Sequence, residues 1–421
     1  MTATSAPQPM ITRSSAEVLV AAVAAFGVGL RLPLPMGLTT SLVLGALLVP
    51  LWLSVVPRFE GARTVTICFL GATVFGLFLT WASSLRLGFD SSLAIATSIN
   101  YWSIFLGAGV LWWCRTIIGT ALSALLLSAS LLLSVSRSNP DVIANPFKFG
   151  YGVPLTIAVL AIAMLIGVWW VQFAALAVIG LLALTFDSRS FFAVILLTIV
   201  ILWWQKIAQA VAGRSLFLAT AGLVVASAGV YRLASTLAAA GGLGTAAAAR
   251  TIAQEQSSGS LLLGGRPELA ATWALFREYP MGFGLGSPPT LPQILVAKEG
   301  MVAIGYNPFN GYVERYMLGG RFELHSLGGD FWAHMGLAGL ALAVLIVAVM
   351  IKGLLVQMRA ENASALVVFL ALMLFWNVAF SPLFASIGAT LAALAFVPSD
   401  REATQDVSTP QPESLSDTPA E

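Results

Sequence analysis

Residues 152–186, GVPLTIAVLAIAMLIGVWWVQFAALAVIGLLALTF, form an apolar run without a charged side chain. A helix that crosses a membrane needs about 20 largely apolar residues. The run could therefore form one long tilted helix or two short ones. We predict two helices, over residues 152–167 and 169–186.

The composition of the whole chain extends this interpretation. Of its 421 residues, 58% are hydrophobic and only 10% are charged, and the mean hydropathy is +0.90. Soluble globular domains carry about 25% charged residues. We predict an all-α polytopic membrane protein with about 12 transmembrane helices. The other predicted spans cover residues 17–30, 37–56, 64–85, 91–113, 116–135, 190–206, 214–232, 331–351, 364–380 and 382–397.

The distribution of Lys and Arg sets the predicted orientation, because cytoplasmic segments retain positive charge. The first apolar run follows Arg13 and lacks a small-residue cleavage site, so we predict a retained helix rather than a removed signal peptide. With twelve spans and the N-terminus inside, the cytoplasmic cations outnumber those of the short outer loops. The predicted cytoplasmic set is Arg13, Arg58, Arg63, Arg115, Lys206, Arg214, Lys352, Arg359 and Arg401, and the outer set is Arg31, Arg86, Arg137, Lys148 and Arg189.

Two polar segments divide the chain into regions. Residues 1–232 hold the first nine predicted spans, residues 233–330 form a long extracytoplasmic loop, and residues 331–398 hold the last three spans. Residues 399–421 are acidic and rich in Ser, Thr and Pro, which predicts a disordered cytoplasmic tail without chemistry. Long loops are usually functional when they are ordered. We therefore expect the active site in the loop.

The best-defined element of the loop is RPELAATWALFREYP, which starts at Arg266. Pro267 suits the first turn of a helix, and Pro280 marks its end. The following MGFGLGSPP is glycine-rich, and such loops can hold phosphate, but the nucleotide fingerprint needs a preceding strand and a following helix. We exclude a Rossmann or P-loop fold and consider a tight surface turn at least as plausible. The Ala-rich residues 235–260 are expected to be partly helical.

Neither the cysteines nor the histidines indicate a metal site. Cys68 and Cys114 lie in different predicted spans, and the chain has only two histidines, His325 and His334. At about 100° per residue, histidines nine positions apart on one helix face opposite sides. We therefore expect no metal and no cofactor. We interpret His334 as an interfacial residue that bonds to Asp330 one turn earlier.

The sequence HSLGGDFWAHMGLAGLALAVLI, which begins at His325, resembles the hallmark of the O-antigen ligase and O-antigen polymerase family. In that family a His and a small polar residue precede a Gly-x-x-Gly that opens the next span. Gly336 and Gly339 match the glycines. Gly329 replaces a large apolar residue, and His334 stands where the family usually has Glu.

Two further motifs match in type and order. The sequence SRS around Arg189 resembles the Ser-Arg step of the family outside a pair of spans, and GRPELAATWALFREYPMGFGLGS resembles a segment in which an Arg starts a helix. That Arg is Arg266. The resemblance covers roughly residues 150–351 by motif and the remainder by hydropathy.

The resemblance implies a GT-C-like bacterial enzyme on the outer face of the plasma membrane. It would move a glycan from undecaprenyl pyrophosphate to the hydroxyl of a glycan or lipid-anchored acceptor, with inversion and without a metal. We expect membrane lipid around the protein and no nucleic-acid partner. Arg189, Arg266 and Arg321 are the candidates for binding pyrophosphate, because the guanidinium holds phosphate oxygens bidentately.

His325 is the candidate general base, since imidazole accepts a proton near neutral pH. It could instead orient the acceptor. The structural alternatives for the arginines are ion pairs, of Arg189 with Asp187 and of Arg266 with Glu268.

Two other functions stay open. A polymerase would use a second lipid-linked repeat as the acceptor, with the same donor and much the same site. A transporter or flippase for lipid-linked glycan is the candidate from another class. The scarcity of charged residues in the spans disfavours it, because transport pathways usually carry ionisable groups.

Overall fold

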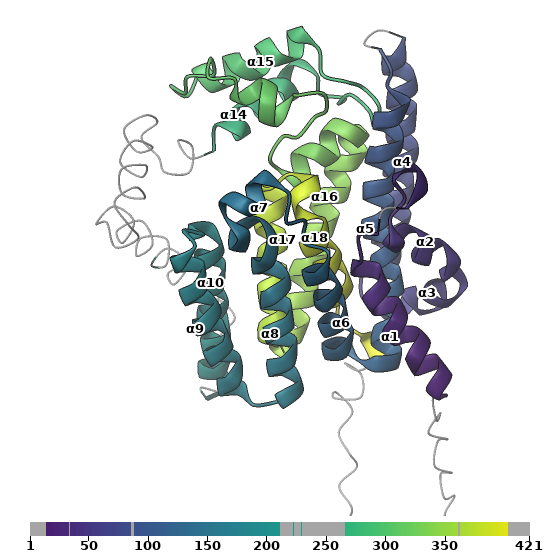
Figure 1. Cartoon of the computed structure of the whole chain (residues 1–421), viewed down its shortest axis with the longest axis vertical. Helices are drawn as coiled ribbons and strands as arrows, with labels where there is room; N and C mark the ends of the chain where they lie inside the picture. Colours follow the sequence, from purple (N-terminus) through teal and green to yellow (C-terminus); the bar gives the residue numbers. More distant parts are fainter. Residues whose placement is uncertain are drawn as a thin grey trace, which may run out of the picture.

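The computed structural model describes residues 14–402, except residues 33, 86–87, 211–221, 223–228, 230–265 and 361–362. Within the described part the chain is helical, and the β pairing there is one isolated bridge between Phe59 and Asp400. Figure 1 shows a bundle of helices with a smaller helical layer at one end. The span predicted at 214–232 and the Ala-rich residues 235–260 lie outside the described residues, apart from two positions.

The other predicted spans coincide with helices. Apolar residues in these segments supply the main buried core. The helices are α1 (Ser15–Gly29), α2 (Thr40–Leu47) with α3 (Val49–Val55), α4 (Ala62–Ser84), α5 (Ser91–Ile118), α6 (Thr120–Leu133), α8 (Gly152–Ile166), α9 (Trp169–Thr185), α10 (Arg189–Ala210), α16 (Leu327–Arg359), α17 (Ala365–Phe380) and α18 (Leu383–Phe396).

The prediction of two helices within residues 152–186 is confirmed. Helix α8 ends at Ile166, and Gly167 follows in the left-handed region with φ +74°. Its N–H donates to the carbonyl of Ala163. Glycine adopts this conformation without a steric penalty, which explains why the run breaks at Gly167.

The segment predicted as a span over residues 37–56 is helical but bent. Helices α2 and α3 meet at an angle of 77°. Pro50 occupies the first turn of α3. Proline has no N–H to donate to the preceding turn, and its ring disfavours a helical conformation in the residue before it. The apolar composition of the segment masked this break.

Helix length separates two groups of apolar helices in the described part of the chain. Five helices are long and apolar enough to cross a membrane, or six if the bent pair counts as one span. The shorter helices α1, α6, α9, α17 and α18 have 14 to 17 residues. At 1.5 Å per residue they are about 21–26 Å long, below a hydrocarbon thickness of about 30 Å. The protein is thus a helical membrane protein.

Several predicted cytoplasmic cations lie together at one end of the bundle. Arg58 pairs with Asp400 at 2.8 Å, and Lys352 pairs with Glu60 at 2.8 Å. Arg115 donates from Nη1 to the Pro398 carbonyl at 3.1 Å. The chain therefore gathers these cations where α5, α16 and the chain after α18 meet.

The boundary of the predicted disordered tail is wrong by a few residues. The N–H of Glu60 donates to the Ser399 carbonyl at 3.0 Å, and Asp400 holds Arg58. Ion pairing and backbone bonding thus fix residues 399–402 to the α3–α4 connection. Residues 403–421 lie outside the described part.

Candidate functional site

Helix α14 (Pro267–Glu278) begins and ends where the sequence predicts. Pro267 stands at its first position, and Tyr279, which precedes Pro280, ends it. Helix α15 (Leu291–Val302) packs against α14. Together they form a layer beside the N-terminal end of α16 (Figure 1). A second cluster of buried side chains, including Leu275, Met301 and Trp332, holds this layer to α16.

The glycine-rich turn after α14 is buried, which corrects the expectation of a surface turn. The N–H groups of Phe283 and Gly284 both donate to the Ala333 carbonyl of α16, at 2.8 and 3.0 Å. The N–H of Leu285 donates to Thr80 Oγ1 of α4 at 2.8 Å. The glycines therefore allow a close approach of backbone to α4 and α16, and the turn anchors α14 to the bundle.

His325 immediately precedes α16, whose N-cap is Ser326. Its backbone has φ +52°, a left-handed conformation that is uncommon outside glycine. The ring nitrogen Nε2 lies 3.1 Å from the Tyr316 carbonyl oxygen, and Nδ1 lies 3.9 Å from Glu268 Oε1. Because a carbonyl only accepts, Nε2 must be the protonated nitrogen in this contact. In the neutral ring, Nδ1 is then the atom free to accept a proton.

Glu268 is a buried carboxylate next to this nitrogen. Its side chain is 8% exposed, and Oε1 accepts from the Tyr312 hydroxyl at 2.5 Å. Burial raises the pKa of the Tyr312 phenol, and the charge and hydrogen bond of Glu268 raise it further. The phenol therefore stays protonated and donates. Oε2 of Glu268 is buried without a hydrogen-bond partner among the described residues.

Buried hydrogen bonds hold the backbone around His325. Asp330 accepts from the Leu324 N–H at Oδ1 (2.7 Å) and from the Leu383 N–H at Oδ2 (2.6 Å). Ser326 Oγ donates to the Val378 carbonyl at 2.7 Å. These three bonds are buried or partly buried. They fix the His325 backbone to the corner between α17 and α18.

His334 does bond to Asp330, as expected, but to its backbone and not to its carboxyl group. His334 Nδ1 lies 2.9 Å from the Tyr101 hydroxyl of α5. Asp330 sits in the first turn of α16, where unpaired backbone N–H groups from neighbouring segments compete for its oxygens. His334 is 2% exposed, so it is a core residue rather than an interfacial one.

Arg266 and Arg321 both reach the α17–α18 corner. Arg266 donates from Nη1 to the Phe380 carbonyl at 3.1 Å and lies 5.4 Å above the Trp376 ring. Arg321 lies 3.9 Å above the Phe384 ring and pairs with Glu323. The predicted alternative of an Arg266–Glu268 ion pair is not the contact seen, since this guanidinium faces α17.

Arg189 occupies a different part of the fold. It starts α10, and its Nε lies 3.4 Å from Asp187 Oδ1, so the predicted ion-pair alternative is seen. The contacts described above join Arg266, Arg321 and His325 to one corner. They do not include Arg189.

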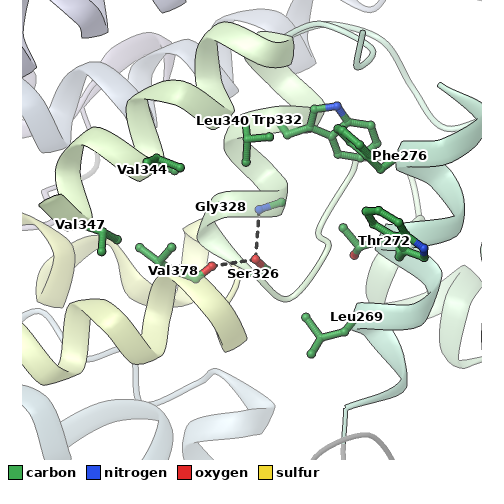
Figure 2. Close-up of a pocket in the computed structure, with 13 residues that line it drawn as sticks. Leu269, Thr272, Phe276, Ser326, Gly328, Trp332, Leu340, Val344, Val347 and Val378 are labelled. Carbon is green, nitrogen blue, oxygen red and sulfur yellow. Dashed lines mark hydrogen bonds between the residues drawn. The ribbon is translucent and has the colours of Figure 1, made fainter. Parts of the chain in front are cut away.

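An apolar pocket of about 440 Å³ lies beside this corner. Figure 2 shows side chains of α14 on one side of it, those of α16 and α17 on the other, and Ser326 between them. Leu269, Trp273 and Phe276, the apolar stripe of α14, contribute one wall. The complete lining is Leu269, Thr272, Trp273, Phe276, Ser326, Gly328, Gly329, Trp332, Leu340, Ala343, Val344, Val347 and Val378.

The lining of the pocket includes the sequence neighbours of two polar residues. Ser326 lines the pocket, and His325 is the preceding residue. Glu268 is likewise next to Leu269, another lining residue.

Sequence reasoning missed Glu268 and Tyr312 as site residues. An acidic residue in the first turn of a helix ordinarily stabilises the helix dipole in solvent. The only local signal was RPEL, an Arg and a Glu around the expected helix start. The hydroxyl that donates to Glu268 belongs to Tyr312, which is 44 positions away.

No protein-family model, curated protein or solved structure matches this chain. In the described residues no group of three or more His, Cys, Asp or Glu side chains is arranged to hold a metal ion. The arrangement seen is an imidazole, a buried carboxyl group and two guanidinium groups, in segments that adjoin an apolar pocket in the sequence.

Proposed function

We propose that the protein is an O-antigen ligase-like glycosyltransferase. It moves a glycan from undecaprenyl pyrophosphate to an acceptor hydroxyl on the outer face of the bacterial plasma membrane, by inversion and without a metal. The observation that carries the proposal is an apolar pocket whose lining includes Ser326 and Leu269, which lie close in the sequence to His325 and Arg266. A polyprenyl pyrophosphate has the matching form, a long apolar chain with an anionic head.

Each group has a task in this reaction. The pocket takes part of the polyprenyl chain, and the guanidinium groups of Arg266 and Arg321 hold pyrophosphate oxygens. Nδ1 of His325 removes the proton of the acceptor hydroxyl as its oxygen attacks the anomeric carbon. The bond from that carbon to the pyrophosphate breaks, and the electron pair leaves with the pyrophosphate. Arg189 lies in a different part of the fold, and its role in binding the donor stays a prediction.

The position of the site along α16 supports the outer face. His325 precedes the first residue of this 33-residue helix, whereas Lys352 and Arg359 lie near its end. After the break at Gly336, the remaining 23 residues of α16 extend about 35 Å, enough to cross a hydrocarbon core of about 30 Å. The predicted cytoplasmic cations and the site are therefore at opposite ends of one spanning helix. We further propose that the shorter apolar helices also cross the membrane. The bundle would then be GT-C-like, with about 12 spans.

The deciding experiment uses full-length protein in liposomes with a glycan on undecaprenyl pyrophosphate. We expect release of undecaprenyl pyrophosphate coupled to glycan transfer. A lipid-anchored core that accepts the glycan supports a ligase, and a second lipid-linked repeat that accepts it supports a polymerase. Passage of the intact lipid-linked glycan across the bilayer, with no transfer to any acceptor, would replace the proposal with transport.

The pocket predicts a specific effect of filling it. Val347 lines the pocket, and a Val347→Trp variant places a large ring there. We expect KM for the polyprenyl donor to rise about tenfold, because one buried isoprene unit is worth a few kcal/mol and 1.4 kcal/mol is a factor of ten. Transfer kinetics at varied donor concentration measure the change.

The matched control for this variant lies one turn further along the same helix face. Ile351 is 45% exposed and does not line the pocket. Ile351→Trp is expected to leave KM unchanged. An equal rise in both variants, or none in Val347→Trp, would argue that the polyprenyl chain binds elsewhere.

A further inference from the structure

The surroundings of His325 assign different tasks to its two ring nitrogens. Nε2 is committed to the Tyr316 carbonyl at 3.1 Å, so proton transfer must take place at Nδ1. Nδ1 lies 3.9 Å from Oε1 of the Glu268 carboxylate. That separation is too long for a direct hydrogen bond but short enough for a strong interaction between opposite charges.

On the basis of the proposed function, we propose that Glu268 is a positioning residue that stabilises the imidazolium form of His325 during transfer. The acceptor O–H bond breaks and its proton moves to Nδ1, while the acceptor oxygen forms the new bond to the anomeric carbon. The imidazolium that results faces the Glu268 carboxylate. Once the product has left, the ring returns its proton to water, and the pyrophosphate product carries the electron pair of the broken bond.

The environment of Glu268 fits a role in charge stabilisation. A buried carboxylate is costly unless it is fully paired. Here Tyr312 satisfies Oε1, whereas Oε2 is buried without a partner among the described residues. The position of Glu268 in the first turn of α14 favours its negative charge, because that helix end is positive. A carboxylate held in this way is available for a cation that forms only during the reaction.

The test combines Glu268→Gln with His325→Asn in the transfer assay. Glutamine keeps an oxygen for the Tyr312 hydroxyl but removes the charge. We expect kcat of Glu268→Gln to fall about 100-fold with KM unchanged, because the lost interaction exists only in the transition state. Glu268→Asp, which keeps the charge, should recover part of the rate. In the His325→Asn background, Glu268→Gln should have no further effect.

The control substitution is Glu278→Gln, at the exposed end of the same helix, which should leave kcat unchanged. A wild-type protein without transfer activity would refute the proposed function itself. With an active wild type, the inference is overturned if Glu268→Gln keeps its rate or raises only KM. It is also overturned if its effect persists fully in the His325→Asn background.

A second measurement needs no activity. The chain has only two histidines, so 15N-histidine labelling gives two rings to follow by NMR, and His325→Asn assigns them. At a pH where the ring is neutral, we expect His325 to carry its proton on Nε2. A proton on Nδ1 would mean that the neutral ring already donates to Glu268, and it would overturn the inference.

Discussion

The His325→Asn variant is expected to lose glycan transfer, with kcat lower by about 10²- to 10⁴-fold, the usual contribution of a general base. Asparagine has no nitrogen that accepts a proton near neutral pH. It is nevertheless one of the few residues that tolerate the left-handed backbone seen at this position, where φ is +52°. The variant therefore removes the base while it keeps the backbone. Initial rates of transfer in proteoliposomes measure the effect.

The second histidine provides the control for this experiment. His334 lies in α16, nine residues after His325, and it faces the Tyr101 hydroxyl in the core. His334→Gln should lower thermal stability, by about 1–2 kcal/mol for a lost buried hydrogen bond, but keep the turnover of folded protein. If His325→Asn retained the wild-type rate, His325 would not be the base, and a role in orienting the acceptor would fail as well.

Much of the fold could be predicted from the sequence because bilayers impose a simple rule on composition. Apolar runs such as residues 152–186 must satisfy their backbone groups internally, and in one chain segment only a helix does so. The break at Gly167 and the start of α14 at Pro267 followed from residue types with strong local preferences. The bend before Pro50 carried the same kind of signal. Hydropathy hid it, because a bent and a straight helix can have equal composition.

The candidate site was only partly predictable. His325, Arg266 and Arg321 were expected, and the structure places all three at the α17–α18 corner or beside it. Glu268 joins them because α14 packs close to the segment of Tyr312, a contact between distant parts of the chain. Helical spacing suggested a bond between Asp330 and His334, and His334 does bond to the Asp330 backbone, but the Asp330 carboxyl group and Nδ1 of His334 have their partners on other elements. The spacing of residues within one helix does not reveal contacts with other helices.

The Gly336→Ala variant is expected to destabilise the protein by about 3–5 kcal/mol. Gly336 interrupts α16 with φ +60° and ψ −149°, a conformation that is essentially restricted to glycine. A Cβ there would lie 2.5 Å from the Met281 carbonyl oxygen and 2.7 Å from Leu79 Cδ1. Backbone strain and overpacking each cost about 1–3 kcal/mol. Thermal unfolding of the purified protein in detergent measures the loss.

The break at Gly336 also shapes the site, which makes this substitution informative beyond stability. The Ala333 carbonyl, three residues before the break, accepts two N–H groups from the turn after α14. Straightening α16 would therefore release α14, and with it Glu268 and one wall of the pocket. Gly71→Ala is the control, since a Cβ there meets nothing within 4 Å, and its stability should stay level or rise slightly. A Gly336→Ala protein as stable and as active as Gly71→Ala would show that α16 does not need the break to hold α14 in place.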